Sequence, residues 1–455
     1  MNKLAYFNSD SAAVRASLLA SKINNKLATV GIVGLGYVGL PLATSIAKTG
    51  LATIGFDIDK SKIEKLSNSE SYIDAVSTAD LSDVIKRGRF RATSDFEKFA
   101  ICDVICLCVP TPLSRQREPD LTFVEGTVKE IAKYLRRDQL IVLESTTYPG
   151  TTDEVVKPIL EQSGLTSGTD FFLAYSPERE DPGNKAFSTV TIPKIVAGDG
   201  QLAQSLVETF YRVFIERIVP VSSVRTAEVV KITENVFRAV NIAMINELKI
   251  IYTAMGIDIW EVIDAAKTKP FGFMPFYPGP GLGGHCIPVD PFYLTWKSRE
   301  FELPTRFIEL AGEINQNMPR YVVAQLEEAL DKRFSLSLSQ ASILLIGMAY
   351  KKNVADIRES PALRILELLE KRVAEIAYHD PFVQNISPEN FHGTKSNVKS
   401  IDVNTESIAS YDAVVILTDH DSIDFNIIAR HSRLVIDTRN ALGSRGITCS
   451  RVVKA

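Results

Sequence analysis

The sequence is poor in cysteine, histidine and tryptophan, with five, five and two of these residues among 455. Five cysteines are too few for a disulfide framework, and an odd number leaves at least one thiol unpaired. No apolar run reaches the roughly 20 residues that a membrane-spanning helix needs. The net charge is only -4, which gives no general attraction to nucleic acid. We therefore expect neither a disulfide-stapled domain nor a membrane or nucleic-acid partner.

The remaining composition is that of an ordinary globular protein, because 45% of the residues are hydrophobic and 23% are charged. The length exceeds what one hydrophobic core normally supports, so we expect two or three domains that share one site. Residues 1–25 lack the compact apolar run and small-residue cleavage site of a secretory signal. We interpret them as a short N-terminal extension and expect a cytoplasmic protein.

Residues 26–221 alternate between strand-like and helical patterns. An apolar strand at 28–33, a glycine turn, a helix at 38–48 and a strand at 52–56 form a βαβ unit. Further strands are expected at 104–109, 140–144 and 171–175, and a further helix at 123–135. This alternation predicts a parallel, doubly wound sheet.

The rest of the chain changes pattern twice. Residues 222–333 carry apolar side chains at helical spacing, which predicts a long central helix with a partner, interrupted by a Pro- and Gly-rich loop at 270–284. Residues 334–455 return to alternation, with strands expected at 341–347, 375–378, 413–417 and 434–437 and a helix at 361–372. No repeat can be aligned between the two α/β regions. The sequence thus predicts an α/β fold with two Rossmann-like, doubly wound domains joined by a long central helix.

The first glycine turn has the form GxGxxG, made by Gly34, Gly36 and Gly39. These glycines allow a tight turn, a close approach of the backbone to a pyrophosphate, and close packing of helix and strand. Asp57 ends the next strand at the distance expected of a residue that binds the adenosine ribose, and its charge favours NAD over NADP, although Lys60 is near. The alternative is a glycine turn without a ligand and a solvated aspartate.

Three cysteines, Cys102, Cys106 and Cys108, fall within one apolar, strand-like run. No second Cys or His cluster completes a tetrahedral set, so we interpret them as small buried hydrophobic residues and expect no metal.

Two further patterns indicate chemistry. Lys231 and Asn235 are four residues apart on the expected central helix and share a face, from which they could hold a hydroxyl and stabilise an alkoxide; the alternative is a solvated polar surface. Cys286 follows two glycines in a polar loop and precedes Asp290 by four residues, as a nucleophile near a proton acceptor would. His285 adjoins the thiol, but adjacent side chains usually point apart, so we do not expect it to activate Cys286.

At these residues the chain resembles the UDP-glucose/GDP-mannose dehydrogenase family, from Lys26 onward. The resemblance is carried by seven motifs in family order, at residues 34–41, 109–112, 144–146, 175–179, 231–235, 278–286 with Asp290, and 347–351 followed by 356–361. It implies an NAD domain, a central helix that makes a dimer or higher homo-oligomer contact, and a C-terminal UDP-binding domain. It also implies oxidation of a UDP-sugar at C6 in two NAD-dependent steps through a thiohemiacetal and a thioester.

The resemblance implies roles residue by residue. Cys286 would be the nucleophile, Lys231 and Asn235 would hold the reacting oxygen, Asp290 and Thr146 would bind water, and Glu178 would lie near the thioester. Further cofactor contacts are expected from Tyr37, Val38, Pro110, Thr111 and Arg358, and further substrate contacts from Arg179, Tyr277, Gly283 and Lys351.

The choice of sugar rests on finer resemblance. The UDP-glucose branch usually has an arginine before its glycine-cysteine loop, whereas residues 269–278 contain none. The segments at 175–183 and 278–294 look most like the branch that oxidises UDP-N-acetylglucosamine, for polysaccharide or lipopolysaccharide precursors. UDP-N-acetylmannosamine is the next alternative, followed by UDP-glucose or a UDP-N-acetylgalactosamine sugar. A single-step β-hydroxyacid dehydrogenase, which needs no thiol, and a catalytically silent nucleotide-sugar binding protein are the competing functions.

Overall fold

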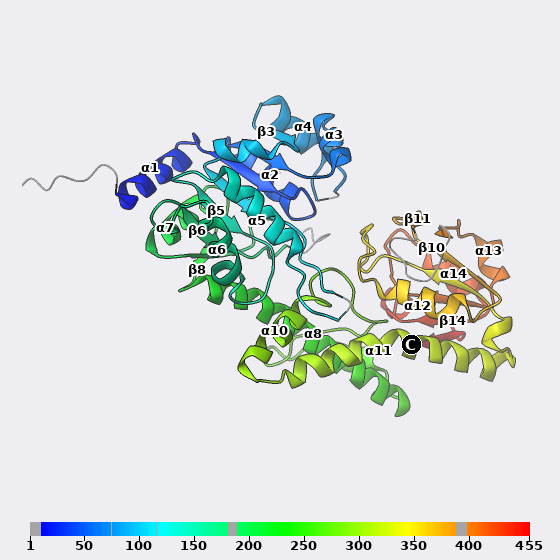
Figure 1. Cartoon of the computed structure of the whole chain (residues 1–455). Coiled ribbons are helices and arrows are strands. Elements are labelled where there is room, and N and C mark those ends of the chain that lie inside the picture. Colours follow the sequence, from blue (N-terminus) through cyan, green and yellow to red (C-terminus); the bar gives the residue numbers. More distant parts are fainter. Residues whose placement is uncertain (1–10, 74, 115, 181–188, 388–397) are drawn as a thin grey trace, which may run out of the picture. The chain divides into compact units, whose positions relative to one another are not determined.

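The computed structural model describes residues 11–73, 75–114, 116–180, 189–387 and 398–455 (Figure 1). Residue contacts divide the chain into two compact units. The first contains Met1–Glu234 and Trp296–Glu302, and the second contains Asn235–Thr295 and Leu303–Ala455. None of the described helices is both long enough and apolar enough to cross a membrane.

The first unit is built on one sheet with strand order β3-β2-β1-β4-β5-β6-β7-β8, parallel except between β6 and β7. Every strand expected in residues 26–221 is present. Three strands were not expected: β3 and β8, which are short, partly polar edge strands, and β7, which lies between β6 and β8. The strands are β1 Thr29–Val33, β2 Ala52–Phe56, β3 Phe90–Thr93, β4 Val104–Leu107, β5 Leu140–Leu143, β6 Phe172–Tyr175, β7 Lys194–Gly198 and β8 Ile218–Pro220.

Helices of the first unit cover this sheet (Figure 1). They are α1 Ala12–Asn24, α2 Gly39–Lys48, α3 Lys60–Ser67, α4 Thr78–Lys86, α5 Thr122–Tyr134, α6 Lys157–Glu161 and α7 Gln201–Tyr211. The side chain of Ser11 caps α1 by accepting the N–H of Val14. Leu19 and Ile23 of α1 join the same core as β1, β4, α2 and α7. The segment treated above as an extension therefore contributes buried area to the first unit.

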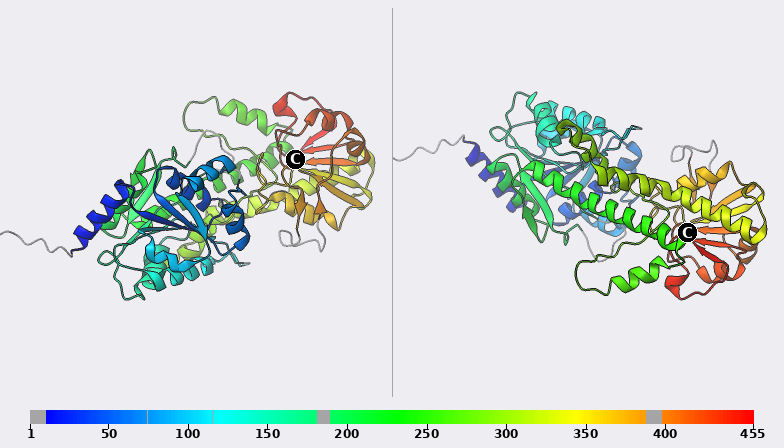
Figure 2. Two further views of the ribbon diagram at one scale, coloured as in Figure 1. Left: turned by 90° about the horizontal axis from the view of Figure 1, so that it is seen from above. Right: turned by 90° about the horizontal axis from the view of Figure 1, so that it is seen from below.

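Long helices follow, and α8 Val224–Ala254 contains the boundary between the units, after Glu234. The expected central helix and partner are present as α8 and α9 Ile259–Ala266, separated by Gly256 with a φ of 73°. In the second unit, α11 Arg306–Phe334 runs beside α8 (Figure 2), and the Asn246 amide donates to Asn315 Oδ1 over 2.9 Å between them. The helix α10, Asp290–Ser298, follows the expected catalytic loop.

The second unit contains a parallel sheet with strand order β10-β9-β13-β14-β15. One face packs against α11 and α12 and the other against α13 and α14, which is the doubly wound arrangement expected from the sequence. The strands are β9 Ser342–Ile346, β10 Glu375–His379, β13 Ala413–Ile416, β14 Val435–Asp437 and β15 Val452–Lys454, with a separate pair of β11 Asn385–Ile386 and β12 Val398–Lys399. The helices are α12 Pro361–Glu370, α13 Thr405–Ser410 and α14 Phe425–His431.

Candidate active site

The glycine turn after β1 has the geometry that a dinucleotide needs. Gly34 has a φ of 88°, and a Cβ there would lie 2.5 Å from the carbonyl oxygen of Cys108. A Cβ on Gly39 would lie 1.8 Å from the Gly34 carbonyl oxygen. A Cβ on Gly36 would meet nothing within 4 Å, so no protein atom requires a glycine there. The N-terminus of α2 has no side-chain cap, which leaves it suited to a phosphate.

Asp57 lies at the end of β2 and is nearly buried. Its Oδ2 accepts the N–H of Leu35 in the glycine turn over 2.9 Å, and its Oδ1 accepts the N–H of Asp59. The nearby cation that contacts it is Lys62, at 3.2 Å, rather than Lys60. Asp57 thus shapes the turn, and its carboxylate oxygens still have lone pairs for ribose hydroxyls. The residues present fit NAD.

Two expected cofactor segments meet beyond the carboxyl ends of β4 and β5. The Thr111 hydroxyl donates to the carbonyl of Thr146 over 2.7 Å, and the Ser145 hydroxyl donates to the carbonyl of Val109 over 2.7 Å. This edge, next to the switch of strand order between β1 and β4, is where dinucleotides bind open α/β sheets. Pro110 is exposed and Tyr37 partly exposed at the same edge of the unit.

The three cysteines in and beside β4 differ in burial, and two of them are packed as the expected buried residues. Cys102 and Cys106 are buried, Cys108 is half-buried, and burial raises the pKa of each thiol above its usual value. Among the described residues, no group of three or more His, Cys, Asp or Glu side chains could hold a metal ion.

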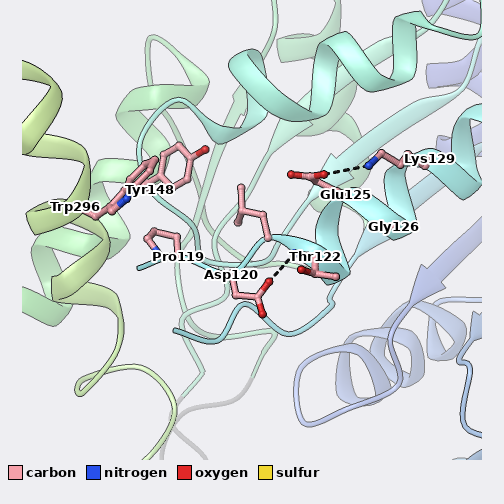
Figure 3. A pocket seen from close by; sticks show the side chains of 9 residues that line it. Pro119, Asp120, Thr122, Glu125, Gly126, Lys129, Tyr148 and Trp296 are labelled. Atoms are coloured by element: carbon pink, nitrogen blue, oxygen red, sulfur yellow. Dashed lines mark hydrogen bonds and ion pairs between the residues drawn. The ribbon is translucent and has the colours of Figure 1, made fainter. Parts of the chain in front are cut away.

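A pocket of the first unit lies at the start of α5 (Figure 3). The ring of Tyr148 packs at a tilt against Trp296 on one side, with ring centroids 4.7 Å apart, and Lys129 pairs with Glu125 on the other. The lining residues are Pro119, Asp120, Leu121, Thr122, Glu125, Gly126, Lys129, Tyr148 and Trp296. No residue predicted to bind cofactor or substrate is among them.

Glu178 belongs to a buried ionic cluster in the first unit. Its Oε1 accepts the N–H groups of Arg179 and Glu180 over 2.6 and 2.7 Å. Its Oε2 accepts from the ammonium of Lys194, which also donates to Glu144. Arg179, expected to bind substrate, pairs with Glu234 of α8 and donates to the carbonyl of Pro193. The protein therefore already engages the Arg179 guanidinium, and its assignment to substrate stays a prediction.

The central helix presents the expected polar pair. Lys231 and Asn235 lie one turn apart on α8, and both are buried. In the second unit the Asn235 amide donates to the carboxylate of Asp290, and its oxygen accepts from Arg238. The N–H of Asp290 in turn donates to the carbonyl of Cys286 over 2.8 Å. Asn235, Asp290 and the Cys286 backbone are thus joined in one hydrogen-bonded chain.

The cysteine loop packs on the segment after β9. A Cβ on Gly283 would lie 2.5 Å from Cβ of Tyr350, and one on Gly284 would lie 2.9 Å from the Tyr350 ring. The N–H of Gly284 donates to the carbonyl of Arg358 over 2.9 Å. The two glycines are therefore required by this packing as well as by any ligand. Cys286 is half-buried and forms no disulfide with another described cysteine.

Burial and the nearby Arg358 guanidinium lower the pKa of His285, which favours the neutral ring and disfavours an imidazolium–thiolate pair with Cys286. That His285 does not activate Cys286 stays a prediction. Arg358 itself pairs with Asp356, its Nη2 lying 2.6 Å from the carboxylate.

In the second sheet, the loops after β9, β13 and β14 meet beyond the carboxyl ends of the strands. A Cβ on Gly347, after β9, would lie 2.3 Å from the carbonyl oxygen of Thr418, after β13. Lys351 follows on the same loop. Arg439, after β14, donates from Nε to the carbonyl of Leu417, and its guanidinium lies against Gly279 of the loop that leads to Cys286. This edge also adjoins a switch in strand order, so it is suited to a nucleotide.

Several functional candidates were missed in the sequence analysis. Lys194 and Glu144 became visible only through contacts that span 50 residues, although Glu144 lies in a family motif. Arg439 follows a short strand and had no spacing partner. Tyr350 lies within the family motif at residues 347–351, but its packing on Gly283 and Gly284 could not be predicted from the sequence.

Comparison with known proteins covers almost the whole chain. Three family models match: the NAD binding domain of the UDP-glucose/GDP-mannose dehydrogenase family at residues 28–215, its central domain at 225–317 and its UDP binding domain at 344–444. A UDP-N-acetyl-D-glucosamine 6-dehydrogenase of Pseudomonas aeruginosa is 37% identical over 393 residues, covering 86% of this chain and 90% of that protein.

A UDP-N-acetyl-D-mannosamine dehydrogenase of Pyrococcus horikoshii is 34% identical over 420 residues. A solved structure of a UDP-N-acetyl-D-mannosamine dehydrogenase from Pyrococcus horikoshii, also 34% identical, superposes with a TM-score of 0.82, and the match covers 91% of this chain and 96% of that one. A UDP-glucose dehydrogenase structure from Pyrobaculum islandicum is 25% identical, with a TM-score of 0.81, and covers 93% and 96%. The chain belongs to the UDP-glucose/GDP-mannose dehydrogenase family and is an NAD-dependent nucleotide-sugar dehydrogenase.

Proposed function

We propose that this enzyme oxidises the C6 alcohol of UDP-N-acetylglucosamine to the carboxylate, with Cys286 as the covalent nucleophile. The observation that carries the proposal is the hydrogen-bonded chain from Asn235 through Asp290 to the backbone of Cys286. It holds the thiol's loop against the helix that also carries Lys231. A single-step dehydrogenase has no use for a thiol so placed.

The first oxidation produces an aldehyde. The glycine turn of Gly34, Gly36 and Gly39 would hold NAD, which would supply the hydride acceptor for C6 in each of the two oxidations, one NAD per hydride. The buried ammonium of Lys231 stabilises the alkoxide that forms as the hydroxyl proton departs, and Asn235 fixes the position of that oxygen. The Asp290 carboxylate, held by the Asn235 amide, orients the water that takes the proton.

The second oxidation uses the thiol. The sulfur of Cys286 adds to the aldehyde carbon and gives a thiohemiacetal, whose oxyanion Lys231 stabilises. Loss of a second hydride from that carbon gives a thioester, and water then releases the acid and the thiol. Glu178 and Thr146 are assigned to this hydrolytic step.

The nucleotide is assigned to the second unit. Lys351 and the guanidinium of Arg439 supply positive charge for a diphosphate at the edge made by Gly347 and Thr418. That Gly283 contacts the substrate and that Arg358 contacts the cofactor stay predictions.

The sugar is the finer part of the proposal. Tyr277 stacks on Trp260 with ring centroids 5.6 Å apart. Residues 269–278 contain no arginine, unlike the UDP-glucose branch that the resemblance describes. Two UDP-N-acetyl-D-glucosamine 6-dehydrogenases at 37% and 35% identity support the N-acetylglucosamine reading. The Pyrococcus horikoshii relative, 34% identical over 91% of this chain, is a UDP-N-acetyl-D-mannosamine dehydrogenase, so UDP-N-acetylmannosamine is the second candidate.

The test is NADH formation with UDP-N-acetylglucosamine, UDP-N-acetylmannosamine and UDP-glucose side by side. We expect the highest kcat/KM with UDP-N-acetylglucosamine. A higher value with either of the other two would overturn the sugar assignment, and absence of NADH with all three would overturn the proposed activity.

We also propose that the enzyme is at least a dimer. Phe237, Met244 and Ile251 of α8 lie seven residues apart in sequence, and 48%, 46% and 46% of their respective surfaces are exposed. Such a stripe fits a second copy of the chain. A Met244→Glu variant should sediment as a smaller species, and an unchanged mass would contradict this contact. A cytoplasmic location stays a prediction.

A further inference from the structure

Lys194 is a buried cation of the first unit, and the two oxidation steps assign it no role. Lys194 begins β7, and its side chain is 4% exposed. Its ammonium donates to Glu144 Oε2 over 2.6 Å and to Glu178 Oε2 over 2.9 Å, and it lies 5.3 Å from the centroid of the Tyr211 ring. One lysine thus bridges two carboxylates that come from the ends of β5 and β6.

The two carboxylates are held differently. Glu144 is completely buried, and the Tyr211 hydroxyl donates to it. Glu178 keeps 12% of its side chain exposed, and three donors fix it: Lys194 on one oxygen and two backbone N–H groups on the other. Glu178 is therefore the member of the bridged pair that reaches the surface of the unit, and its orientation is set from within.

The pKa values of the two glutamates are shifted in opposite directions. Burial raises the pKa of Glu144. Burial alone would also raise that of Glu178, but Lys194 and the two backbone N–H groups bring its pKa below the usual value. Burial and the Glu178 charge raise the pKa of Glu180 to about 8, so that this third carboxyl is neutral at pH 7.

The cluster is poorly explained by stability alone. Desolvation of buried ions largely cancels their attraction, so an ion pair of this kind adds little net stability. Its specific consequence is a carboxylate that stays ionised and points in one direction.

We propose that Lys194 is a positioning residue for the hydrolytic step, in which it holds Glu178 as the base that activates water. This rests on the proposed function, which supplies the thioester. The water oxygen bonds to the thioester carbon while Glu178 takes one water proton, and the carbon–sulfur bond then breaks. The proton passes to the Cys286 thiolate, and the second water proton leaves as the product acid ionises.

The test compares Lys194→Met with Lys194→Arg and with a control, Lys157→Met. Lys157 pairs with Asp199 at 2.8 Å and is one-third exposed in the same unit. In rapid mixing with UDP-sugar and NAD, Lys194→Met should still form NADH in a burst, after which steady turnover falls about 100-fold. Intact-mass measurement should then show the acyl adduct on the protein. Lys194→Arg should recover part of the rate, and Lys157→Met should match the wild type.

The pH profile supplies a second readout. The groups that face Glu178 or its bridge are Glu144, Lys194, Tyr211, Glu180, Arg179 with its partner Glu234, Cys106 and Cys108. Removing the Lys194 charge raises the pKa of Glu178, so the acid limb of kcat should move to higher pH. Glu144→Gln removes the carboxylate that shares the Lys194 ammonium with Glu178 and repels it, so the pKa of Glu178 should fall and the acid limb should move to lower pH. The glutamine oxygen can still accept the hydrogen bond from Tyr211.

The outcomes are distinguishable. A folded Lys194→Met enzyme without burst or adduct, or one that matches Lys157→Met, would overturn the role of Lys194. If Lys194→Met does not fold, the direction of the Glu144→Gln shift decides, and an unmoved or raised acid limb overturns the proposal. A wild-type enzyme that yields one NADH per sugar would instead overturn the proposed function itself.

Discussion

The two sheets of this enzyme share a local arrangement that the sequence does not align. In the first unit, Gly34 follows β1 with a φ of 88° and packs on the carbonyl of Cys108, beyond the neighbouring strand β4. In the second, Gly347 follows β9 with a φ of 84° and packs on the carbonyl of Thr418, beyond β13. In both, an aspartate directly after the adjacent strand, β2 or β10, accepts the N–H of the residue that follows the glycine.

The difference lies in what happens after the glycine. Behind Gly34 the chain enters α2 within a few residues, and Asp57 keeps a small exposed fraction. Behind Gly347 no helix begins until Pro361, and Asp380 is fully buried. Asp380 accepts four backbone N–H groups and contacts His420 Nε2 at 3.1 Å. The same turn therefore leaves an aspartate available to a ligand in one unit and closes it off in the other.

The largest expected effect tests whether the two turns are equivalent. Gly34→Ala and Gly347→Ala should each destabilise their own unit by about 3–5 kcal/mol, because each adds positive-φ strain and a clash with a carbonyl oxygen. Gly126→Ala, inside α5 with no atom within 4 Å of the added Cβ, is the control and should be neutral or slightly stabilising. Hydrogen exchange resolved by unit would measure this. Equal stability of all three variants would contradict the steric role given to Gly34 and Gly347.

The second prediction separates the aspartates. Asp380→Asn should destabilise the second unit by about 2–4 kcal/mol, because the new amide donor faces groups that are themselves donors. Asp57→Asn should lower stability by only about 1 kcal/mol and mainly weaken NAD binding. Chemical denaturation and NAD titration measure the two effects. A larger loss of stability in Asp57→Asn than in Asp380→Asn would contradict the structural role of Asp380 and the ligand-binding role of Asp57.

The smallest effect concerns the open glycine of the first turn. Gly36→Ala should leave thermal stability unchanged, since no protein atom lies near the added methyl. It should raise KM for NAD about tenfold, because the methyl occupies the approach to the pyrophosphate. KM for the UDP-sugar should not change. A normal KM for NAD, or a loss of stability, would show that Gly36 does not face the cofactor.

Much of this fold could be predicted from the sequence. Strands with uninterrupted apolar runs, such as β1, β4 and β9, were located to within one or two residues, since burial on both faces leaves a strong signal. Short edge strands such as β3 and β15 were missed because their pattern is weak. The helix α1 was missed because its apolar stripe acquires meaning only through packing on α7.

The candidate site was predicted unevenly for a similar reason. Asn235 and Asp290 were named separately, and the structure brings them into contact. Lys194 could not be found, since nothing in its own segment indicates that it bridges two glutamates, 50 and 16 residues before it. The steric reason for Gly283 and Gly284 was equally hidden, because it is the Tyr350 side chain, more than 60 residues onward.

The most direct test of the account is the count of NADH formed per UDP-sugar when the sugar is limiting and NAD is in excess. The account predicts two NADH per sugar, together with loss of steady turnover in Cys286→Ser. One NADH per sugar, or a serine variant that turns over at the wild-type rate, would contradict the covalent role of Cys286.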